Sequence, residues 1–188
     1  MLYELARPFL FRLDAEDAHA MSLKSLCALE RSGMAHLLLP QVRRRPVQAM
    51  GLAFPNPLGL AAGMDKHAEY VQGLGSLGFG FLELGGVTPR PQPGNPRPRV
   101  FRIPQAEAII NRYGFNSVGV DQFVANLRRS RYQGIVGVNL GKNKDTPNER
   151  AVDDYLHSFE KVYPLAHFAT INVSSPNTAE LRQLQSED

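Results

Sequence analysis

The sequence contains only one cysteine, Cys27, among its 188 residues. A single thiol excludes an internal disulfide framework and a metal cluster built from thiolates, and it indicates a reducing compartment. No apolar run approaches the roughly 18 residues of a membrane-spanning helix, and no signal-peptide pattern occurs. Lys and Arg exceed Asp and Glu by only 21 to 18. No basic stripe interleaves with aromatics, so the composition favours a small-molecule partner over a nucleic acid.

The 43% hydrophobic content suffices for one sizeable core with an appendage. Residues 1–46 form that appendage, because apolar side chains recur at helical spacing over residues 2–13 and Asp14 can cap a second helix. This arm is either a helical hairpin packed on the main domain or a device for a membrane surface or apolar ligand. Substrate chemistry is expected to need none of its residues.

From residue 47 to 188 the pattern changes to short apolar runs that alternate with helical segments, which predicts parallel βα units. The four predicted strands are Pro57 to Ala62, Phe79 to Gly85, Ile135 to Leu140 and His167 to Val173. The predicted helices between them are Ala68 to Leu77, Val120 to Arg131 and Glu149 to Tyr163. Nearly continuous apolar strands are typical of a sheet covered on both faces.

Polar or glycine-rich residues follow each predicted strand: Ala62 to Lys66, Gly85 to Thr88, Asn139 to Lys142, and Asn172 to Thr178. In a (β/α)8 barrel these strand ends form the active-site face. The last group offers hydroxyls and amides without charge, which suits a polar heterocycle better than a phosphate. Any one group could be an ordinary turn. Their repetition at the same topological position favours a site.

Two further stretches need an interpretation. Gly73 to Gly78 matches G-x-G-x-x-G, but it closes a predicted helix and precedes a strand, so it is not a dinucleotide-binding loop. Residues 88–104 hold six prolines and four arginines without an acidic residue. We interpret this stretch as an insertion that folds over the active-site face and brings Asn111 and Phe115 near the ligand. A solvated loop is the alternative.

Five motifs in order resemble the quinone-dependent class 2 dihydroorotate dehydrogenases over essentially the whole chain. They are Gly59 to Lys66, Val87 to Asn95, Asn111 to Asn116, Asn139 to Lys144 and Asn172 to Asn177. The resemblance implies a (β/α)8 TIM barrel, here only its first half, preceded by the two-helix arm. It also implies oxidation of (S)-dihydroorotate to orotate, with FMN as hydride acceptor and a membrane quinone as electron acceptor, in pyrimidine biosynthesis.

The resemblance assigns roles to individual residues. It implies that Ser175 is the catalytic base, with Thr178 and Phe115 as proton relay, and it implies no metal. The implied substrate contacts are Lys66, Asn111, Arg112, Tyr113, Gly114, Phe115, Asn172 and Asn177. The implied FMN contacts are Ala62, Gly63, Met64, Asp65, Lys66, Gly86, Asn139 and Asn172. Neutral amides suit a pyrimidinedione, and a lysine suits an anionic carboxylate or developing flavin charge.

Class 1 relatives use a cysteine as base, whereas the corresponding loop position here holds Ser175 and the single cysteine lies in the arm. That difference favours class 2. The arm is then expected to contact the membrane peripherally and to serve the quinone. The expected location is the cytoplasmic side of a bacterial inner membrane.

Two departures from the family pattern stand out. Gly86 occupies a position where relatives commonly have Thr or Ser, so a side-chain hydrogen bond to FMN is lost there. Residues 57–188 amount to about half of the roughly 250 residues of a complete barrel, and the second half would supply the phosphate site. We therefore keep two hypotheses, a flavin-dependent dihydroorotate dehydrogenase and a non-catalytic half-barrel without independent activity.

Overall fold

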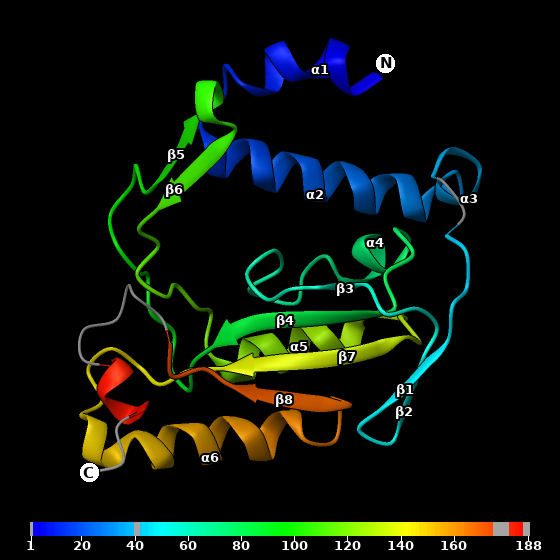
Figure 1. Ribbon diagram of the computed structural model, residues 1–188. Helices are drawn as coiled ribbons and strands as arrows, with labels where there is room; N and C mark the ends of the chain where they lie inside the picture. Colours follow the sequence, from blue (N-terminus) through cyan, green and yellow to red (C-terminus); the bar gives the residue numbers. More distant parts are fainter. Residues whose placement is uncertain (1, 40–41, 175–180, 186–188) are drawn as a thin grey trace.

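The computed structural model describes residues 2–39, 42–174 and 181–185 (Figure 1). Its α-helices are α1 (Leu2–Leu10), α2 (Ala15–Arg31), α3 (Ala35–Leu38), α4 (Val71–Gly75), α5 (Val120–Arg129) and α6 (Ala151–Val162). Its strands are β1 (Val47–Ala49), β2 (Leu52–Phe54), β3 (Gly59–Leu60), β4 (Phe81–Val87), β5 (Val100–Ile103), β6 (Ala108–Asn111), β7 (Ile135–Leu140) and β8 (Phe168–Ile171). Three short 3-10 helices complete it: η1 (Pro104–Ala106), η2 (Asn148–Arg150) and η3 (Leu181–Gln185).

The central sheet has the strand order β3-β4-β7-β8, and all its pairs are parallel. Helices α4, α5 and α6 connect successive strands, as in the first half of a (β/α)8 barrel. Figure 1 shows α2 above this sheet and α6 below it. The predicted half-barrel with two preceding helices is therefore confirmed.

Alternate residues of the two central strands form the core against the helices. Leu82 and Leu84 of β4 and Val138 of β7 have no exposed surface, and Phe123 of α5 is fully buried in the same cluster. Burying such a side chain stabilises the fold by about 1.5–3 kcal/mol. Because side chains alternate along a strand, the residues between them, including Glu83 and Asn139, lie on the other face of the sheet.

An aromatic cluster closes the N-terminal end of the strands. Phe54 of the β1-β2 hairpin lies edge-on to Phe81, with ring centroids 5.3 Å apart, and Phe81 lies 5.9 Å from Phe168. A Cβ at Gly59 would lie 2.0 Å from the Phe81 ring, so only glycine leaves room for that ring. The hairpin was not predicted from the sequence. It leaves the carboxyl ends of the strands as the end that can hold a site.

The bounds of the predicted elements agree best with the structure where the chain is buried. Strand β7 has the predicted bounds, and α4 ends at Gly75 ahead of β4, which confirms that the G-x-G-x-x-G stretch is a helix end. Strand β3 is shorter than predicted. The Asn56 side chain accepts the Leu58 N–H at 3.0 Å, and Pro57 has no N–H, so a turn occupies the positions before Gly59.

Both helices of the arm are confirmed, whereas α3 was not predicted. Asp14 caps α2 by accepting the N–H groups of Glu16 at 2.9 Å and Asp17 at 3.3 Å. Helix α2 packs on the main domain, since Leu23 belongs to the core cluster and a Cβ at Gly73 of α4 would lie 2.8 Å from the Cys27 sulfur. In contrast, Tyr3, Leu5 and Phe9 of α1 are exposed. Within the described ranges, we find no helix with the length and apolarity to cross a membrane.

The proline-rich insertion between β4 and α5 contains the antiparallel hairpin β5-β6. Figure 1 shows this hairpin beside the N-terminal half of α2, away from the sheet. The chain then returns, and Phe115 and Asn116 are buried next to the strand ends. Only the returning part of the insertion therefore covers the predicted site, while the hairpin contacts the arm.

Candidate active site

The loop after β3 is held by a buried carboxylate. Asp65 accepts the N–H groups of His67 at 3.3 Å, Glu69 at 3.0 Å and Tyr70 at 2.7 Å. Burial raises the pKa of the Asp65 carboxyl, although these hydrogen bonds oppose the rise. The turn they create delays the start of α4 to Val71, three residues after the predicted start at Ala68.

The same loop is tied to the end of β4 through the backbone. Gly63 donates its N–H to the Gly85 carbonyl at 2.8 Å, and Gly85 donates to the Asp65 carbonyl at 3.1 Å. Gly63 has a φ of +105°, which favours glycine. The predicted FMN contacts of the first two strands are thus adjacent. Met64, in contrast, is exposed.

Lys66 is the cation of the site. Its Nζ lies 5.3 Å from the ring centroid of Tyr113 and 5.9 Å from that of Phe115, within cation–π range. Burial, and secondarily the charge of Arg99, lowers the pKa of Lys66. None of the ion pairs among the described residues involves Lys66. A half-buried ammonium in this setting can bind an anionic group.

A chain of neutral amides crosses the strand ends. The Asn139 amide donates to the Glu83 carboxylate at 2.9 Å, and the Asn172 amide donates to the Asn139 side-chain oxygen at 3.1 Å. Asn172 is itself fixed, because its N–H bonds the Leu140 carbonyl at 2.8 Å and its carbonyl accepts the Tyr155 hydroxyl at 2.9 Å. The predicted contacts at β7 and β8 are therefore brought together.

Phe115 packs over the glycines at the ends of β4 and β7. A Cβ at Gly86 would lie 2.4 Å from Phe115 Cζ and 3.1 Å from the Asn139 side-chain oxygen, and a Cβ at Gly141 would lie 2.3 Å from Phe115 Cζ. A threonine or serine at position 86 would therefore displace the ring. Gly86 therefore creates the space for Phe115.

Three other predicted substrate contacts lie at the end of β6 and in the residues that follow it. Asn111 ends β6 with an exposed side chain, and the Arg112 guanidinium donates to the Pro98 carbonyl at 3.0 Å. Gly114 is buried, and its Cβ position would lie 2.7 Å from Asn95. Three predicted site residues, Ser175, Asn177 and Thr178, lie outside the described residues.

Two charged residues at the site were not predicted. Glu83 bonds Asn139, and its signal was visible, since it is the single charged side chain within an otherwise apolar strand. Arg99 stands near Lys66 and Tyr113, but nothing in the sequence distinguishes it from the other arginines of the insertion.

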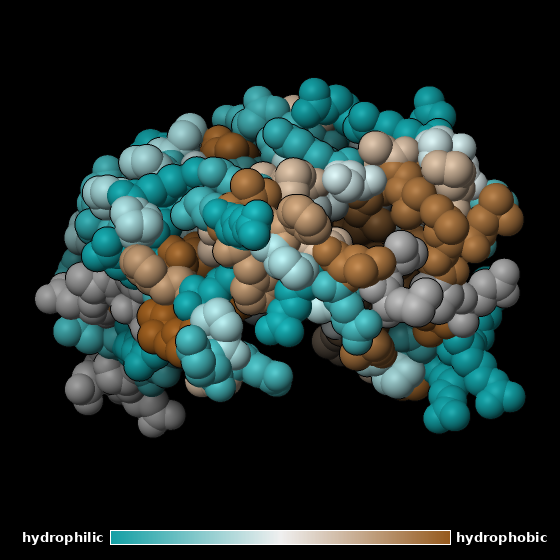
Figure 2. Space-filling view, turned by 90° about the horizontal axis from the view of Figure 1, so that it is seen from above, coloured by the Kyte–Doolittle hydropathy of each residue, from teal (hydrophilic) through white to brown (hydrophobic). Residues whose placement is uncertain are grey.

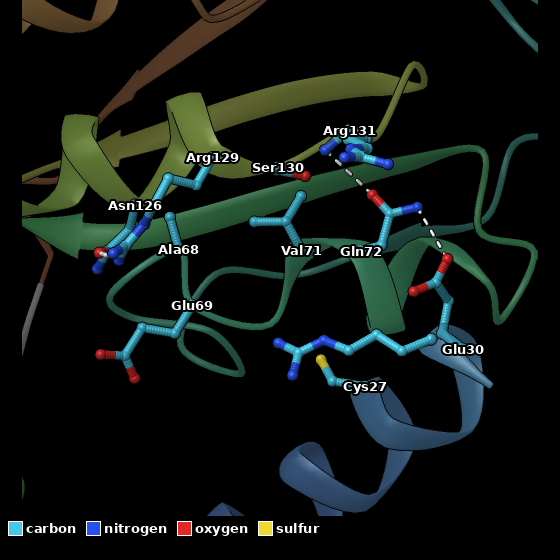
Figure 3. A pocket seen from close by; sticks show the side chains of 11 residues that line it. Cys27, Glu30, Ala68, Glu69, Val71, Gln72, Asn126, Arg129, Ser130 and Arg131 are labelled. Carbon is cyan, nitrogen blue, oxygen red and sulfur yellow. Dashed lines mark hydrogen bonds between the residues drawn. The ribbon is translucent and has the colours of Figure 1, made fainter.

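A cavity of about 770 Å³ lies away from these strand ends, between α2, α4 and the end of α5 (Figure 3). Gln72 bridges its walls, because it donates to the Glu30 carboxylate at 3.0 Å and accepts the Arg131 N–H at 3.2 Å. Exposed charged side chains form much of the lining. We interpret this cavity as a polar seam between arm and barrel, and the amide cluster as the site.

Comparison with known proteins decides the family. The dihydroorotate dehydrogenase family matches residues 46–188. The chain belongs to this family. Similar curated proteins include the dihydroorotate dehydrogenase (quinone) of Methylobacillus flagellatus, 57% identical over all of this chain and 56% of the relative. The Burkholderia cenocepacia protein of the same name is 61% identical over 98% of this chain and 53% of the relative. The chain thus spans just over half the length of these dehydrogenases.

Solved dehydrogenase structures share the fold. DHODH from Eimeria tenella in complex with ferulenol matches 91% of this chain and 46% of its own, with a TM-score of 0.78 and 43% identity. The ligand-free structure from the same organism gives a TM-score of 0.74 at 42% identity, over 88% of this chain and 48% of its own. The half-barrel and its preceding helices are therefore found in experimentally determined members of the family.

Proposed function

We propose that the complete protein containing this chain oxidises (S)-dihydroorotate to orotate in de novo pyrimidine (UMP) biosynthesis, with FMN as hydride acceptor and a membrane quinone as electron acceptor. This chain supplies the first half of that active site. The observation that carries the proposal is the convergence of Lys66, Asn139 and Asn172 at the carboxyl ends of the parallel strands. Relatives that align with the whole chain are named for this activity.

The residues present fit a flavin. A flat ring system needs a floor without side chains, hydrogen-bonding groups at its edges and positive charge near its electron-rich part. Gly63 and the backbone of Ala62 offer the first, since nothing lies within 4 Å of a Cβ at Gly63. Asn139 and Asn172 offer amides, and Lys66 offers the charge. These residues would hold and orient FMN, which would supply the hydride acceptor.

The substrate ring is a pyrimidinedione with alternating donors and acceptors and one carboxylate. Neutral amides from Asn172, Asn177 and Asn111 can pair with the ring, and the Lys66 ammonium can face the carboxylate. We assign Ser175 as the base that takes the C5 proton, with Thr178 and Phe115 as its proton relay. Phe115 is buried against Gly86 and Gly141, so it excludes water from this side of the site.

The arm offers a route for the quinone. A cavity of about 430 Å³ lies between α1 and the β5-β6 hairpin, with Tyr3 and Phe11 on one side and Ile103 and Ile109 on the other. Arg7, Arg102 and Glu107 also line the cavity, and its apolar side chains suit a lipophilic ring and tail.

The same face carries exposed apolar side chains that suit a membrane surface: Leu5 and Phe9 on α1, Met34, and Leu37 and Leu38 on α3. Figure 2 shows hydrophobic residues gathering there toward the side on which Figure 1 places α3. We propose that α1 and α3 rest on the cytoplasmic side of a bacterial inner membrane without crossing it.

The test is Ser175→Ala in the complete protein. If Ser175 removes the proton, flavin reduction by dihydroorotate should slow by about 10²- to 10⁴-fold, the usual contribution of a general base, while flavin content stays unchanged. Stopped-flow absorbance under anaerobic conditions measures the rate. Ser25→Ala is the matched control, because Ser25 is an exposed residue of α2 away from the strand ends. A Ser175→Ala rate equal to that of wild type would remove Ser175 from the role.

A further inference from the structure

Glu16, in the first turn of α2, forms a two-pronged ion pair with Arg99 of the insertion. Arg99 Nη2 donates to Glu16 Oε1 at 2.7 Å, and Arg99 Nε donates to Glu16 Oε2 at 3.0 Å. Both side chains are largely buried, at 9% exposure for Arg99 and 13% for Glu16. The hydrogen bond from Arg99 holds the pKa of the Glu16 carboxyl below its usual range. The pair therefore stays charged at neutral pH.

Arg99 connects this pair to the active site. Its Nη1 donates to the carbonyls of Pro93 at 2.8 Å and Asn95 at 3.0 Å, so the guanidinium is fixed in one orientation. Its Cζ lies 5.3 Å from the ring centroid of Tyr113, and Lys66 Nζ lies at the same distance from that ring. One aromatic ring thus contacts two cations, one anchored to the arm and one at the strand ends.

Two like charges around one ring repel each other unless an anion offsets one of them. Among the described residues, the charged and titratable groups near Lys66 are Arg99 and Tyr113 from the insertion, and Asp65, His67 and Glu69 in its own loop. Asp65 is occupied by backbone N–H groups. The Glu16 carboxylate is therefore the group placed to offset Arg99, since an unpaired buried guanidinium would be costly.

We propose that Glu16 is a positioning residue for the reaction: by neutralising and orienting Arg99, it holds Tyr113 and the Lys66 ammonium at the strand ends. Helix α2 then supports substrate oxidation as well as the quinone side. The inference rests on the proposed function, because Lys66 is taken to face substrate and flavin. It differs from a simple brace between arm and insertion, which would lower stability without changing the ionisation of Lys66.

The test compares Glu16→Gln with Asp17→Asn in the complete, flavin-loaded protein. Asp17 is the neighbouring carboxylate, and among the described residues its ion pair is with the exposed Arg97, at 2.9 Å. Arg97 also lies 3.1 Å from Glu16, but Asp17 makes no ion pair with Arg99 in the described part of the chain. Without the Glu16 charge, Arg99 should lower the pKa of Lys66 further. The rate of flavin reduction by dihydroorotate should fall about 10- to 100-fold, as for a misplaced active-site group, and its decline with rising pH should begin at a lower pH. Asp17→Asn should keep the wild-type profile.

A second readout uses the flavin-free protein and needs no catalysis. Labelling of Lys66 by an amine-reactive reagent, located by mass spectrometry across a pH series, reports its deprotonated fraction. Glu16→Gln should shift the labelling midpoint to lower pH, and Asp17→Asn should not. Glu16→Asp, which keeps the charge on a shorter side chain, should show a smaller loss of rate than Glu16→Gln. It is the variant to measure if Glu16→Gln does not fold.

The outcomes separate the two claims. If wild type reduces its flavin but Glu16→Gln matches Asp17→Asn in rate and in Lys66 labelling, the positioning role is overturned and the proposed function stands. Where Glu16→Gln does not fold, a Glu16→Asp rate equal to that of Asp17→Asn has the same meaning. A uniform loss of rate at every pH with unchanged Lys66 labelling also overturns it, since that is the result of a brace. If wild type does not reduce its flavin with dihydroorotate, the proposed function fails and the inference with it.

Discussion

The ends of the parallel strands and the insertion between β4 and α5 are held in place by different kinds of interaction. At the strand ends, neutral amides bond one another and the backbone, so Asn139 and Asn172 are held by the sheet itself. In the insertion, charged side chains make the contacts to the arm, and Arg99 is held by the Glu16 carboxylate of α2. The positions of Asn139 and Asn172 therefore depend on the folded sheet. The position of Arg99 depends on a contact between segments far apart in the chain.

The first way to sharpen this comparison is to weaken each region by one large apolar side chain. Phe123→Ala removes a fully buried ring that supports the sheet, and we expect it to lower the free energy of unfolding of the complete protein by about 3–5 kcal/mol. Ile109→Ala in the β5-β6 hairpin removes a side chain that is 67% exposed, and we expect a change within about 0.5 kcal/mol. Urea-induced unfolding measures both. Equal losses would contradict the contrast between the sheet core and the insertion.

A second prediction concerns the amide floor. Asn139→Ala leaves the Glu83 carboxylate and the Asn172 amide without the bonds they share with Asn139, which should cost about 1–3 kcal/mol of stability and reduce flavin content. Gln133→Ala is the control, because this exposed amide makes one bond of 3.3 Å to the Arg131 carbonyl. Denaturation and visible absorbance of the purified protein measure the two effects. An Asn139→Ala protein with full flavin and unchanged stability would show that the floor does not depend on this residue.

The smallest predicted effect concerns the different roles of helices α1 and α2 of the arm. The sequence predicted that substrate oxidation needs no residue of the arm, but α2 contributes Leu23 to the core and Glu16 to Arg99. We therefore restrict to α1 the prediction that substrate oxidation needs no residue of the arm. Deleting residues 2–10 should slow reduction of a long-chain quinone in vesicles about tenfold, the effect of losing about 1.4 kcal/mol of attraction.

Flavin reduction by dihydroorotate should stay within about twofold of wild type in the same deletion, because none of the described side chains of α1 belongs to the core cluster. The two half-reactions are measured separately by stopped flow. Equal slowing of both steps would mean that α1, like α2, supports the substrate side.

The sequence predicted the sheet well because its signal is local. Every residue of β7 is apolar, small or at the strand end, and burial on both faces gives an unbroken run with clear limits. The β5-β6 hairpin could not be predicted in the same way. Its residues are largely exposed and alternate with proline and arginine, so neither an apolar run nor a period of two marks the strands.

Some positions of the candidate site are likewise marked by local sequence patterns, and others are not. Lys66, Asn139 and Asn172 could be predicted because they follow buried strands, and parallel strands end at one edge. The late start of α4 could not be predicted, since nothing in the local sequence shows that the Asp65 carboxylate accepts three N–H groups. Glu16 and Arg99 are 83 positions apart and come together only through the packing of α2. Contacts of that range carry no pattern in a single sequence.

The most direct test of the central claim is an anaerobic titration of the complete, oxidised protein with dihydroorotate, followed by the visible absorbance of its flavin. If the strand ends described here form half of a flavin and pyrimidine site, one equivalent of dihydroorotate should bleach the flavin and release orotate. A protein that carries no flavin, or whose flavin keeps its colour under excess dihydroorotate, would contradict the account and favour a non-catalytic half-barrel.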